Sequence, residues 1–425
     1  MHLKTVIAFA VFLSRFELLA GLGVILAALL APQSSWAREI SFFEARAAAE
    51  RVAPDVRLAE QRVGISNAEV DVAGALNNPT LTVSTARQTA RLGTSLAVPL
   101  PLFGQRSTSI RAARADADAV ALDVSLVRKE SRWAASVAWI DLWEAQERAS
   151  VLELAAQDAE RLFQIASEKF DAGTGPRLDV VRTRGDRARS AAEAETARRL
   201  VSAAAARLAP WIGADPGAEL VATGSPGFPP NVPLAVESLE QRLSDHPALR
   251  RDRAQANAAN FHIQNERRLR APILIPQLSV NQFDPTLPGP DVIIGLSFDL
   301  PVLSLRGGAI ARAQAQRAFA EMAAVVDERR LHADLLDACR RTEGANAKLH
   351  AFREQVLPAM KEARAMTEEG YRLGRVDLIR LLDAQRALLE SQLAAAEAEA
   401  SWGRAVADVE KAAGADFQEG NTHAP

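Results

Sequence analysis

The chain has 425 residues, a formal net charge of -3, one cysteine and one tyrosine, and aromatic residues make up only 5% of it. The near-neutral charge gives no indication of a nucleic-acid partner, and the single Cys339 excludes an internal disulfide framework. Abundant Ala, Arg, Leu and Glu with few aromatic residues is typical of long helices rather than of a compact enzyme core.

Residues 1–37 have the organisation of an export signal, with basic residues ahead of an apolar run at 18–31. Ser35 and Ala37 are small residues at positions −3 and −1, which predicts a signal peptide cleaved after Ala37. The alternative is an uncleaved N-terminal anchor. No later run approaches the ~18 apolar residues of a spanning helix. We therefore expect any membrane span of the exported chain to be built from strands.

The first part of the mature chain indicates a helix followed by a β-hairpin. Residues 41–76 have helical periodicity, with a break at Pro54. Residues 80–85 and 93–100 alternate polar and apolar side chains around a short polar connection, which predicts two strands of a hairpin.

A helix of unusual length follows this hairpin. Residues 105–172 contain no Gly and no Pro, so one helix of about 100 Å is predicted. Such a helix is outside the range of globular proteins and indicates a coiled coil or a helical barrel. It ends at a Gly-rich turn, and a second helix is predicted over 178–208, which completes a two-helix hairpin.

A Gly/Pro-rich stretch at 210–235 separates this first half from a second half in which the same order returns. The predicted elements of the second half are a helix at 236–270 broken at His246-Pro247, strands at 277–283 and 292–300, a helix at 309–369 interrupted at Gly344 and Pro358, and a last helix at 377–412.

Matching residues support an internal duplication. The strand exits repeat at a separation of 200 positions, in the pairs Leu96/Leu296, Leu100/Leu300, Pro101/Pro301, Arg106/Arg306 and Ile110/Ile310. The turns between the long helices repeat in the pairs Phe170/Tyr371, Gly173/Gly374 and, after one inserted residue, Leu178/Leu378.

Four strands of about 8–10 residues cannot span a membrane alone, because open edges leave backbone groups unpaired in lipid. A closed membrane barrel needs at least ~8 strands. Three copies pool twelve strands. The predicted fold is therefore mainly α with a small β part, in which long helical hairpins form an α-barrel and four strands per chain contribute to a 12-stranded trimeric membrane β-barrel.

The duplicated order of helix, hairpin, long helix, tip and helix resembles the TolC family of outer-membrane efflux channels. The motifs AVPLPLFGQR, SFDLPVLSLRGG, NPTLTV and IPQLSV are most similar to the heavy-metal branch, which serves cobalt–zinc–cadmium or copper–silver exporters. The resemblance implies a homotrimer in the outer membrane of a Gram-negative cell, in contact with lipid and extending into the periplasm. It also implies two protein partners, a periplasmic adaptor (membrane fusion protein) and an inner-membrane pump of the RND type.

On this resemblance the chain divides into five parts. These are a signal peptide at 1–37, a first repeat at 38–209, a linker at 210–235 in the equatorial region, a second repeat at 236–414 and a disordered tail at 415–425.

The resemblance also assigns candidate site residues at the periplasmic end. The adaptor-contacting tips correspond to Gly173, Thr174, Gly175, Gly374, Arg375 and Val376. The periplasmic gate corresponds to Asp179, Tyr371, Asp377 and Asp383. Any one of these residues is also open to a plainer interpretation, as a helix breaker or as a solvated helix charge. Arg380 stands where the family has a second acidic residue, so the gate is not a strict copy.

No catalytic motif, metal site or cofactor site is predicted. The histidines do not cluster, and no cysteine pair is present. We therefore expect a passive gated conduit rather than an enzyme, exporting heavy-metal cations. The alternatives are a channel for drugs or organic solutes, a periplasmic adaptor, or a soluble coiled-coil protein.

Overall fold

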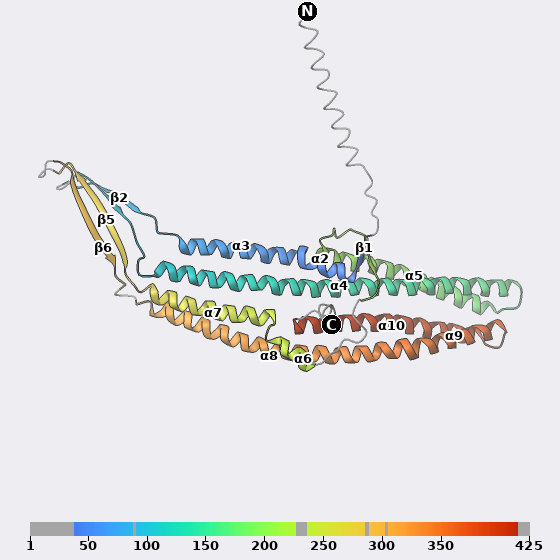
Figure 1. The fold of residues 1–425 in the computed structure, drawn as a ribbon. Helices are drawn as coiled ribbons and strands as arrows, with labels where there is room; N and C mark the ends of the chain where they lie inside the picture. Colours follow the sequence, from blue (N-terminus) through green and yellow to red (C-terminus); the bar gives the residue numbers. More distant parts are fainter. Residues whose placement is uncertain (1–37, 88–90, 227–235, 285–288, 302–304, 415–425) are drawn as a thin grey trace, which may run out of the picture.

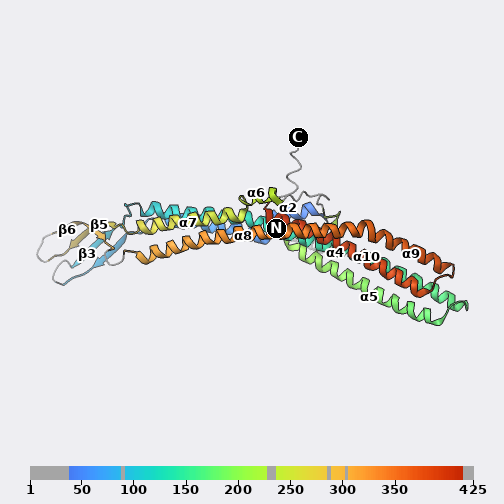
Figure 2. The same cartoon turned by 90° about the horizontal axis from the view of Figure 1, so that it is seen from below.

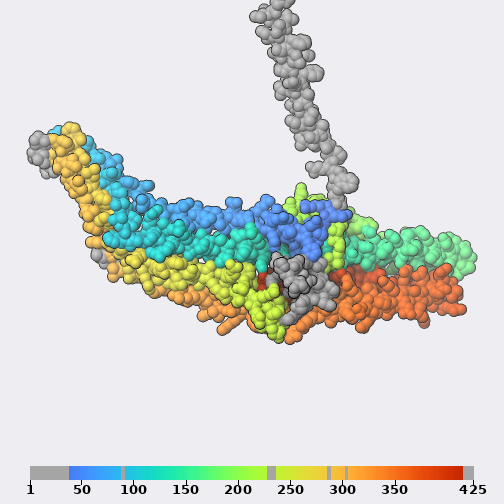
Figure 3. Space-filling model, in the orientation of Figure 1, coloured from blue at the N-terminus to red at the C-terminus, as the bar shows by residue number. Residues whose placement is uncertain are grey.

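The computed structural model describes residues 38–87, 91–226, 236–284, 289–301 and 305–414. The predicted signal peptide and the predicted tail at 415–425 lie outside these ranges. The chain is a long curved rod, with a small sheet at one end and two helical tips at the other (Figures 1 and 3).

The first half begins with strand β1 (Arg38–Ser41) and helices α2 (Phe42–Val52) and α3 (Pro54–Gly74). Ser41 starts α2 through a capping box, in which its hydroxyl accepts from the Glu44 backbone N–H and the Glu44 carboxylate accepts from the Ser41 backbone N–H. Pro54 occupies the first position of α3, where its missing N–H costs nothing. The predicted break at Pro54 is confirmed.

The hairpin and long helix of the first half are also confirmed. Strands β2 (Thr80–Ser84) and β3 (Leu92–Ala97) precede α4 (Gln105–Asp171), a single helix of 67 residues. Helix α5 (Arg177–Leu208) returns along α4 and ends in the 3-10 helix η1 (Ala209–Ile212), after which comes strand β4 (Leu220–Thr223).

The second half has the same order of helix, hairpin, long helix, tip and helix. Its elements are α6 (Val236–Leu243), α7 (Pro247–Arg268), β5 (Ile273–Gln282), β6 (Asp291–Asp299), α8 (Gly307–Ala351), the π-helical turn η2 (Phe352–Val356), α9 (Leu357–Arg372) and α10 (Leu378–Ala413).

The two hairpins join into one antiparallel sheet in the order β2-β3-β5-β6. The junction is the pairing of β3 with β5, which runs from Leu92 opposite Gln282 to Ala97 opposite Gln277. The sheet therefore fuses the two halves, and β2 and β6 are its outer edges.

The strands differ from the prediction in two ways. The described residues contain six strands rather than four, because β1 and β4 pair in parallel in a second, two-stranded sheet. Each of these strands has only four residues, too few for alternation to be recognised. In the first hairpin, β2 has five residues and β3 has six, so the predicted length of 8–10 holds only for β5 and β6.

The long helix of the second half is interrupted once, not twice. Helix α8 continues through Gly344, whose surroundings are open. The π-helical turn η2 lies directly before Pro358. Because proline has no N–H to donate to the preceding turn, the wider turn takes up the lost bond without ending the helix.

Helices stack end to end at mid-length, so that each chain contributes four columns. Helix α4, and α8 with α9, continue past mid-length, while α3 lies in line with α5 and α7 in line with α10 (Figures 1 and 2). At the α10–α7 junction, His246 begins α7. Its Nδ1 accepts from the Ala248 backbone N–H, and its Nε2 bonds the Lys411 carbonyl at 3.2 Å.

The two arginines at matching positions of the strand exits have equivalent structural roles. Arg106 donates to the Gly74 carbonyl at the end of α3, at 2.6 Å. Arg306 pairs with Glu266 near the end of α7, at 2.7 Å. Each arginine therefore fastens the start of a long helix to the end of the helix that enters the same hairpin.

The largest core lies at mid-length, around Trp139. Its indole N–H donates to the Ile40 carbonyl at 2.9 Å, and its ring meets Phe42 edge-on. Arg46 and Glu410 form an ion pair of 2.8 Å beside this core, with both side chains more than nine-tenths buried. No helix in the described ranges has both the length and the apolar character needed to cross a membrane.

We predict that Arg46→Ala lowers the free energy of unfolding by about 3–5 kcal/mol, because it leaves the Glu410 carboxylate buried without this partner. The matched control is Arg128→Ala, which breaks the exposed pair with Glu60 and is expected to cost less than about 1 kcal/mol. Denaturant titration of the purified protein measures both. Equal losses would show that the buried pair has no special role.

Stability is also predicted to depend on pH through His246, whose pKa is lowered by burial. The unfolded chain then takes up a proton more readily than the folded chain. The contribution of His246 is therefore complete above about pH 6.5 and is lost as the pH falls below that value.

The control for the pH dependence of stability is His246→Asn, which keeps a hydrogen-bond acceptor at the start of α7 but cannot titrate. His262 works in the opposite direction, because its bond to Asp116 raises its pKa, but both proteins share it. Unfolding titrations at pH 5 and pH 7.5 should show a larger acid loss in the unmodified chain. An equal loss in the variant would contradict the assignment.

Candidate functional site

The two tips have the same backbone hydrogen bonds. In the first tip, the N–H groups of Thr174 and Gly175 both donate to the Lys169 carbonyl, at 2.9 and 3.0 Å. In the second, the N–H groups of Arg375 and Val376 both donate to the Gly370 carbonyl, at 2.8 and 3.2 Å.

The turn itself requires glycine at one position in each tip. Gly173 has φ of 72° and Gly374 has φ of 69°, which is left-handed backbone that other residues adopt at a cost. The predicted pairing of these two glycines therefore matches the geometry.

A close approach across each tip requires a second glycine, but on opposite sides. A Cβ atom on Gly175 would lie 3.0 Å from Lys169 Cβ, and a Cβ atom on Gly370 would lie 2.6 Å from Val376 Cγ2. Lys169 and Gly370 occupy equivalent positions, as do Gly175 and Val376. The first tip therefore has the larger residue before the turn and glycine after it, whereas the second tip has glycine before the turn and the larger residue after it.

Polar and apolar contacts join the second hairpin to the first. The Lys169 ammonium lies 4.1 Å from the centroid of the Tyr371 ring. Deeper along the helices, Arg364 of α9 pairs with Asp158 of α4 at 3.1 Å. A small apolar cluster of Ala149, Leu152, Ala194 and Ala197 lies further in, with Leu389 and Leu393 of α10 packed on it.

The predicted gate carboxylates occupy different environments. Asp377 caps α10, accepting from the Arg380 backbone N–H at 3.1 Å. Asp179 is half-buried in the first turn of α5. Asp383 is exposed and lines a groove between α5 and α10, which it shares with Asp186 and with Arg182, Arg189 and Arg386. The carboxylate of Asp377 therefore has a local structural role, and that of Asp383 lies among arginines.

One predicted match between the tips is wrong. Helices α5 and α10 begin three residues after Gly173 and Gly374, at caps Pro176 and Asp377, so no residue is inserted. Leu178 is consequently not equivalent to Leu378. Leu178 is 55% exposed, whereas Leu378 is 3% exposed.

Lys169, Gly370 and Arg364 were not singled out by the sequence. The first two could have been found by aligning the tips on Gly173 and Gly374 without a gap, which places Lys169 opposite Gly370. Arg364 and Asp158 are separated by 206 residues, and no local pattern indicates their pairing.

Metal coordination is not a feature of the described ranges. They contain no group of three or more His, Cys, Asp or Glu side chains arranged to hold a metal ion. The histidines instead pair singly with carboxylates, as His332 does with Glu240, or cap a helix, as His246 does.

Residues 46–214 match the family described as "Outer membrane efflux protein". The chain is also 27% identical over 316 residues to the cobalt-zinc-cadmium resistance protein CzcC of Cupriavidus metallidurans, covering 74% of this chain and 75% of that protein. The predicted resemblance to this family and to its heavy-metal branch is confirmed.

Solved structures confirm the fold. The CmeC outer membrane channel of Campylobacter jejuni matches with a TM-score of 0.73 at 15% identity, covering 90% of this chain and 88% of that one. The outer membrane protein VceC of Vibrio cholerae matches with a TM-score of 0.70 at 15% identity, covering 88% and 96%. The names of the matched family and structures describe outer membrane proteins, which agrees with the predicted location.

The close approach of Gly370 to Val376 can be tested by substitution. We predict that Gly370→Ala destabilises the second hairpin by about 1–3 kcal/mol, because its methyl group overlaps Val376. Adding Val376→Gly reproduces the arrangement of the first tip. The double variant should therefore lose less than the sum of the two single variants.

Gly185→Ala is the matched control, because its surroundings are open and it lies inside a helix, where alanine is favoured. Proteolysis at the tips and unfolding titration both report the effect. Additive losses in the double variant would contradict the proposed close approach.

Proposed function

We propose that this TolC-type outer-membrane efflux channel is the exit duct of a tripartite efflux system and that its cargo is heavy-metal cations. The observation that supports the cargo is the similarity to a cobalt-zinc-cadmium resistance protein over three quarters of both chains. The runner-up is a channel for drugs or organic solutes. The adaptor and coiled-coil alternatives find no support, because channel structures match 88–90% of the chain.

The open edges of the single chain support a homotrimer. The four-stranded sheet ends at β2 and β6, whose outward backbone groups have no strand partner in the described residues. The helices follow the same order, with α3 and α8 at the outside of a row in which α4 and α7 are central. Placing β2 and α3 of one copy against β6 and α8 of the next closes both the sheet and the row of helices. Three copies give twelve strands.

Exposed apolar side chains lie on both outer helices. Leu58, Ile65 and Val72 of α3 recur every seven residues and are 55–74% exposed in the single chain. Helix α8 carries exposed Phe319, Met322 and Val326. A heptad stripe of this kind is typical of a helix that packs against another helix. We assign these two sets to the interface between copies.

The tips are the proposed adaptor contacts. Gly173, Thr174, Gly374 and Arg375 are exposed at the end of the rod, while Gly175 and Val376 are half-buried beneath them. The matched hydrogen bonds give the two tips one shape. A trimer would therefore present six similar turns to a partner.

The gate is proposed to open by separation of the two hairpins of each chain. Lys169 and Tyr371 join the hairpins at their tips, and Arg364 and Asp158 join them further in. Asp179, Asp377 and Asp383 remain candidates for contacts between copies. Of these, Asp383 is the best placed, because its side chain is exposed and, unlike that of Asp377, does not cap a helix.

The cargo is tested in Gram-negative cells that lack their own metal-efflux channels and express a periplasmic adaptor and an RND-type pump. Adding the channel should lower accumulated Co²⁺, Zn²⁺ or Cd²⁺ and raise tolerance to that ion. Tolerance to organic dyes is measured in parallel. Dye tolerance without any metal effect would overturn the metal proposal and favour the runner-up.

We predict that Tyr371→Ala increases the population of separated hairpins about fivefold in each chain, and the open population of the gate by at least this factor, through loss of a cation–π contact of about 1 kcal/mol per chain. Tyr371→Phe keeps the ring and should behave like the unmodified chain. Open probability of channels in planar bilayers is the measurement. If the two variants behave alike, the ring is not the closing contact.

We predict that Ile65→Glu prevents trimer formation, because it places a charge in the proposed interface at a cost of about 1–3 kcal/mol or more per contact. Asn67→Glu is the control, since it puts the same charge roughly 160° away around α3. Light scattering in detergent gives the copy number. A trimer that survives Ile65→Glu would remove α3 from the interface.

A further inference from the structure

A buried carboxyl group of α7 has one oxygen atom without a partner. Asp252 is 3% exposed, and the adjacent Arg251 directs both its Nε and its Nη2 to the same oxygen, Asp252 Oδ1, at 2.9 and 2.6 Å. The other oxygen, Oδ2, is buried and accepts no hydrogen bond from the described residues. A carboxylate oxygen in such a place is costly unless it is hydrogen-bonded or protonated.

A second carboxyl group faces Asp252 from α8. Asp327 lies within hydrogen-bonding range of the Asp252 side chain, and its Oδ2 is 3.6 Å from the same Arg251 nitrogen, Nη2. Asp123 approaches from α4, with 3.8 Å between its Oδ1 and Arg251 Nη1. One guanidinium group is therefore surrounded by three carboxyl groups, which come from α4, α7 and α8.

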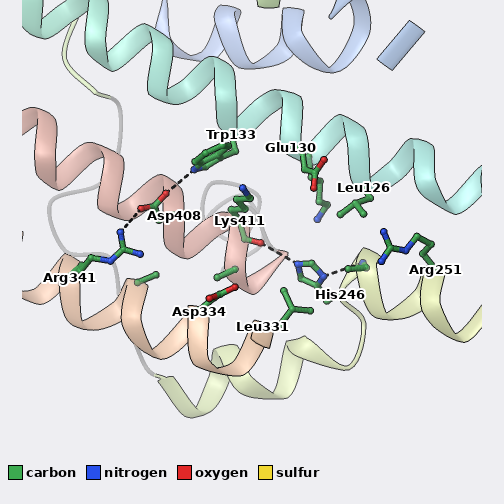
Figure 4. Close-up of a pocket in the computed structure, with 14 residues that line it drawn as sticks. Leu126, Glu130, Trp133, His246, Arg251, Leu331, Asp334, Arg341, Asp408 and Lys411 are labelled. Atoms are coloured by element: carbon green, nitrogen blue, oxygen red, sulfur yellow. Dashed lines mark hydrogen bonds and ion pairs between the residues drawn. The ribbon is translucent and has the colours of Figure 1, made fainter. Parts of the chain in front are cut away.

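The charges around this cluster leave Arg251 as its main cation. Arg330 of α8 lies 3.6 Å from Asp327, but its side chain is 74% exposed, so water screens its charge. Arg251 also lines a cavity of about 360 Å³ together with Glu130 and Asp334, and Figure 4 shows Arg251 directed toward this cavity from α7. Its charge is therefore shared among carboxylates of several helices.

The basic groups on the other side of the cavity do not serve Asp252. His246 precedes it on α7, and burial lowers the pKa of His246, so this imidazole is neutral at neutral pH. Lys129 of α4 and Lys411 of α10 line the same cavity. Lys129 disfavours a proton on His246, and the Lys411 ammonium lies 3.6 Å from the centroid of the Trp133 ring.

The titration of Asp252 follows from these surroundings. Burial raises the pKa of Asp252, and the neighbouring Asp327 adds to this rise. Arg251 opposes both effects, but the net direction is upward. Two carboxyl groups this close to each other hold protons as a pair rather than as independent groups.

We propose that Asp252 and Asp327 form a proton-binding site, in which a proton on Asp252 Oδ2 is donated to the Asp327 carboxylate and joins α7 to α8. The shared proton satisfies the buried oxygen and leaves a single negative charge on the pair for Arg251. Loss of this proton at higher pH places two carboxylates against each other, so the contact between α7 and α8 weakens as the pH rises. The inference is independent of the cargo and of the adaptor.

Thermal unfolding of the purified full-length protein in detergent tests the proposal. A carboxyl group whose pKa is raised in the folded chain stabilises the fold at low pH, and this contribution is lost as the pH rises through the folded-state pKa. Asp252→Asn has the same shape, can still donate to Asp327 and cannot titrate. Between about pH 4.5 and about pH 8, the unmodified protein should therefore lose more of its unfolding temperature than this variant.

The opposite result has a different sign. If Asp252 is an ordinary ionised partner of Arg251, Asp252→Asn lowers the unfolding temperature most at the higher pH, and the proposal is overturned. Equal pH dependence in the variant and in the unmodified protein overturns it as well. His246 and His262 titrate in both proteins, so their contributions cancel in the comparison.

Two further variants separate the shared proton from a general effect of removing acidic residues. Asp327→Asn removes the acceptor and should also reduce the loss of unfolding temperature at high pH, with little further change when it is combined with Asp252→Asn. Asp337→Asn is the matched control on α8, because its side chain is 66% exposed and pairs with Arg341. It should leave the pH dependence of the unmodified protein unchanged. Additive effects of Asp252→Asn and Asp327→Asn would contradict a proton held by the pair.

Discussion

The antiparallel pairing of β3 with β5 is the contact on which the rest of the architecture depends. It joins two hairpins that are far apart in sequence and places the helices that follow them, α4 and α8, in one row with α3 and α7. Among the described strands, β2 and β6 form the open outer edges of this sheet. Because lipid offers no hydrogen bonds, these edges must be closed by other copies if the sheet enters a membrane.

The duplication explains how one chain supplies two equivalent halves of this arrangement. Arg106 and Arg306 fasten the start of each long helix, and the two tips share one set of backbone bonds. The halves differ where they meet at mid-length. There β1 pairs with β4, Trp139 anchors Ile40, and His246 connects α7 to α10. The largest hydrophobic cluster also lies at mid-length, so we expect it to contribute most to the stability of the rod.

Much of this fold could be predicted from the sequence, and the failures have physical causes. The absence of Gly and Pro from 105–172 predicted α4 to within one residue, and alternation predicted both hairpins. Strands β1 and β4 were missed because four residues carry no period. At the tips, Gly173 and Gly374 were identified, but an unnecessary insertion in the alignment hid Lys169 and Gly370. Contacts across the hairpins, such as Arg364 with Asp158, have no local signature.

We propose that three copies close the open edges of the single chain in the outer membrane. The most direct test is the mass of the particle extracted from outer membranes in mild detergent, measured by light scattering or native mass spectrometry without heating. We expect three chains per particle. A single chain in the extract, or recovery of the protein as a soluble periplasmic monomer, would contradict it.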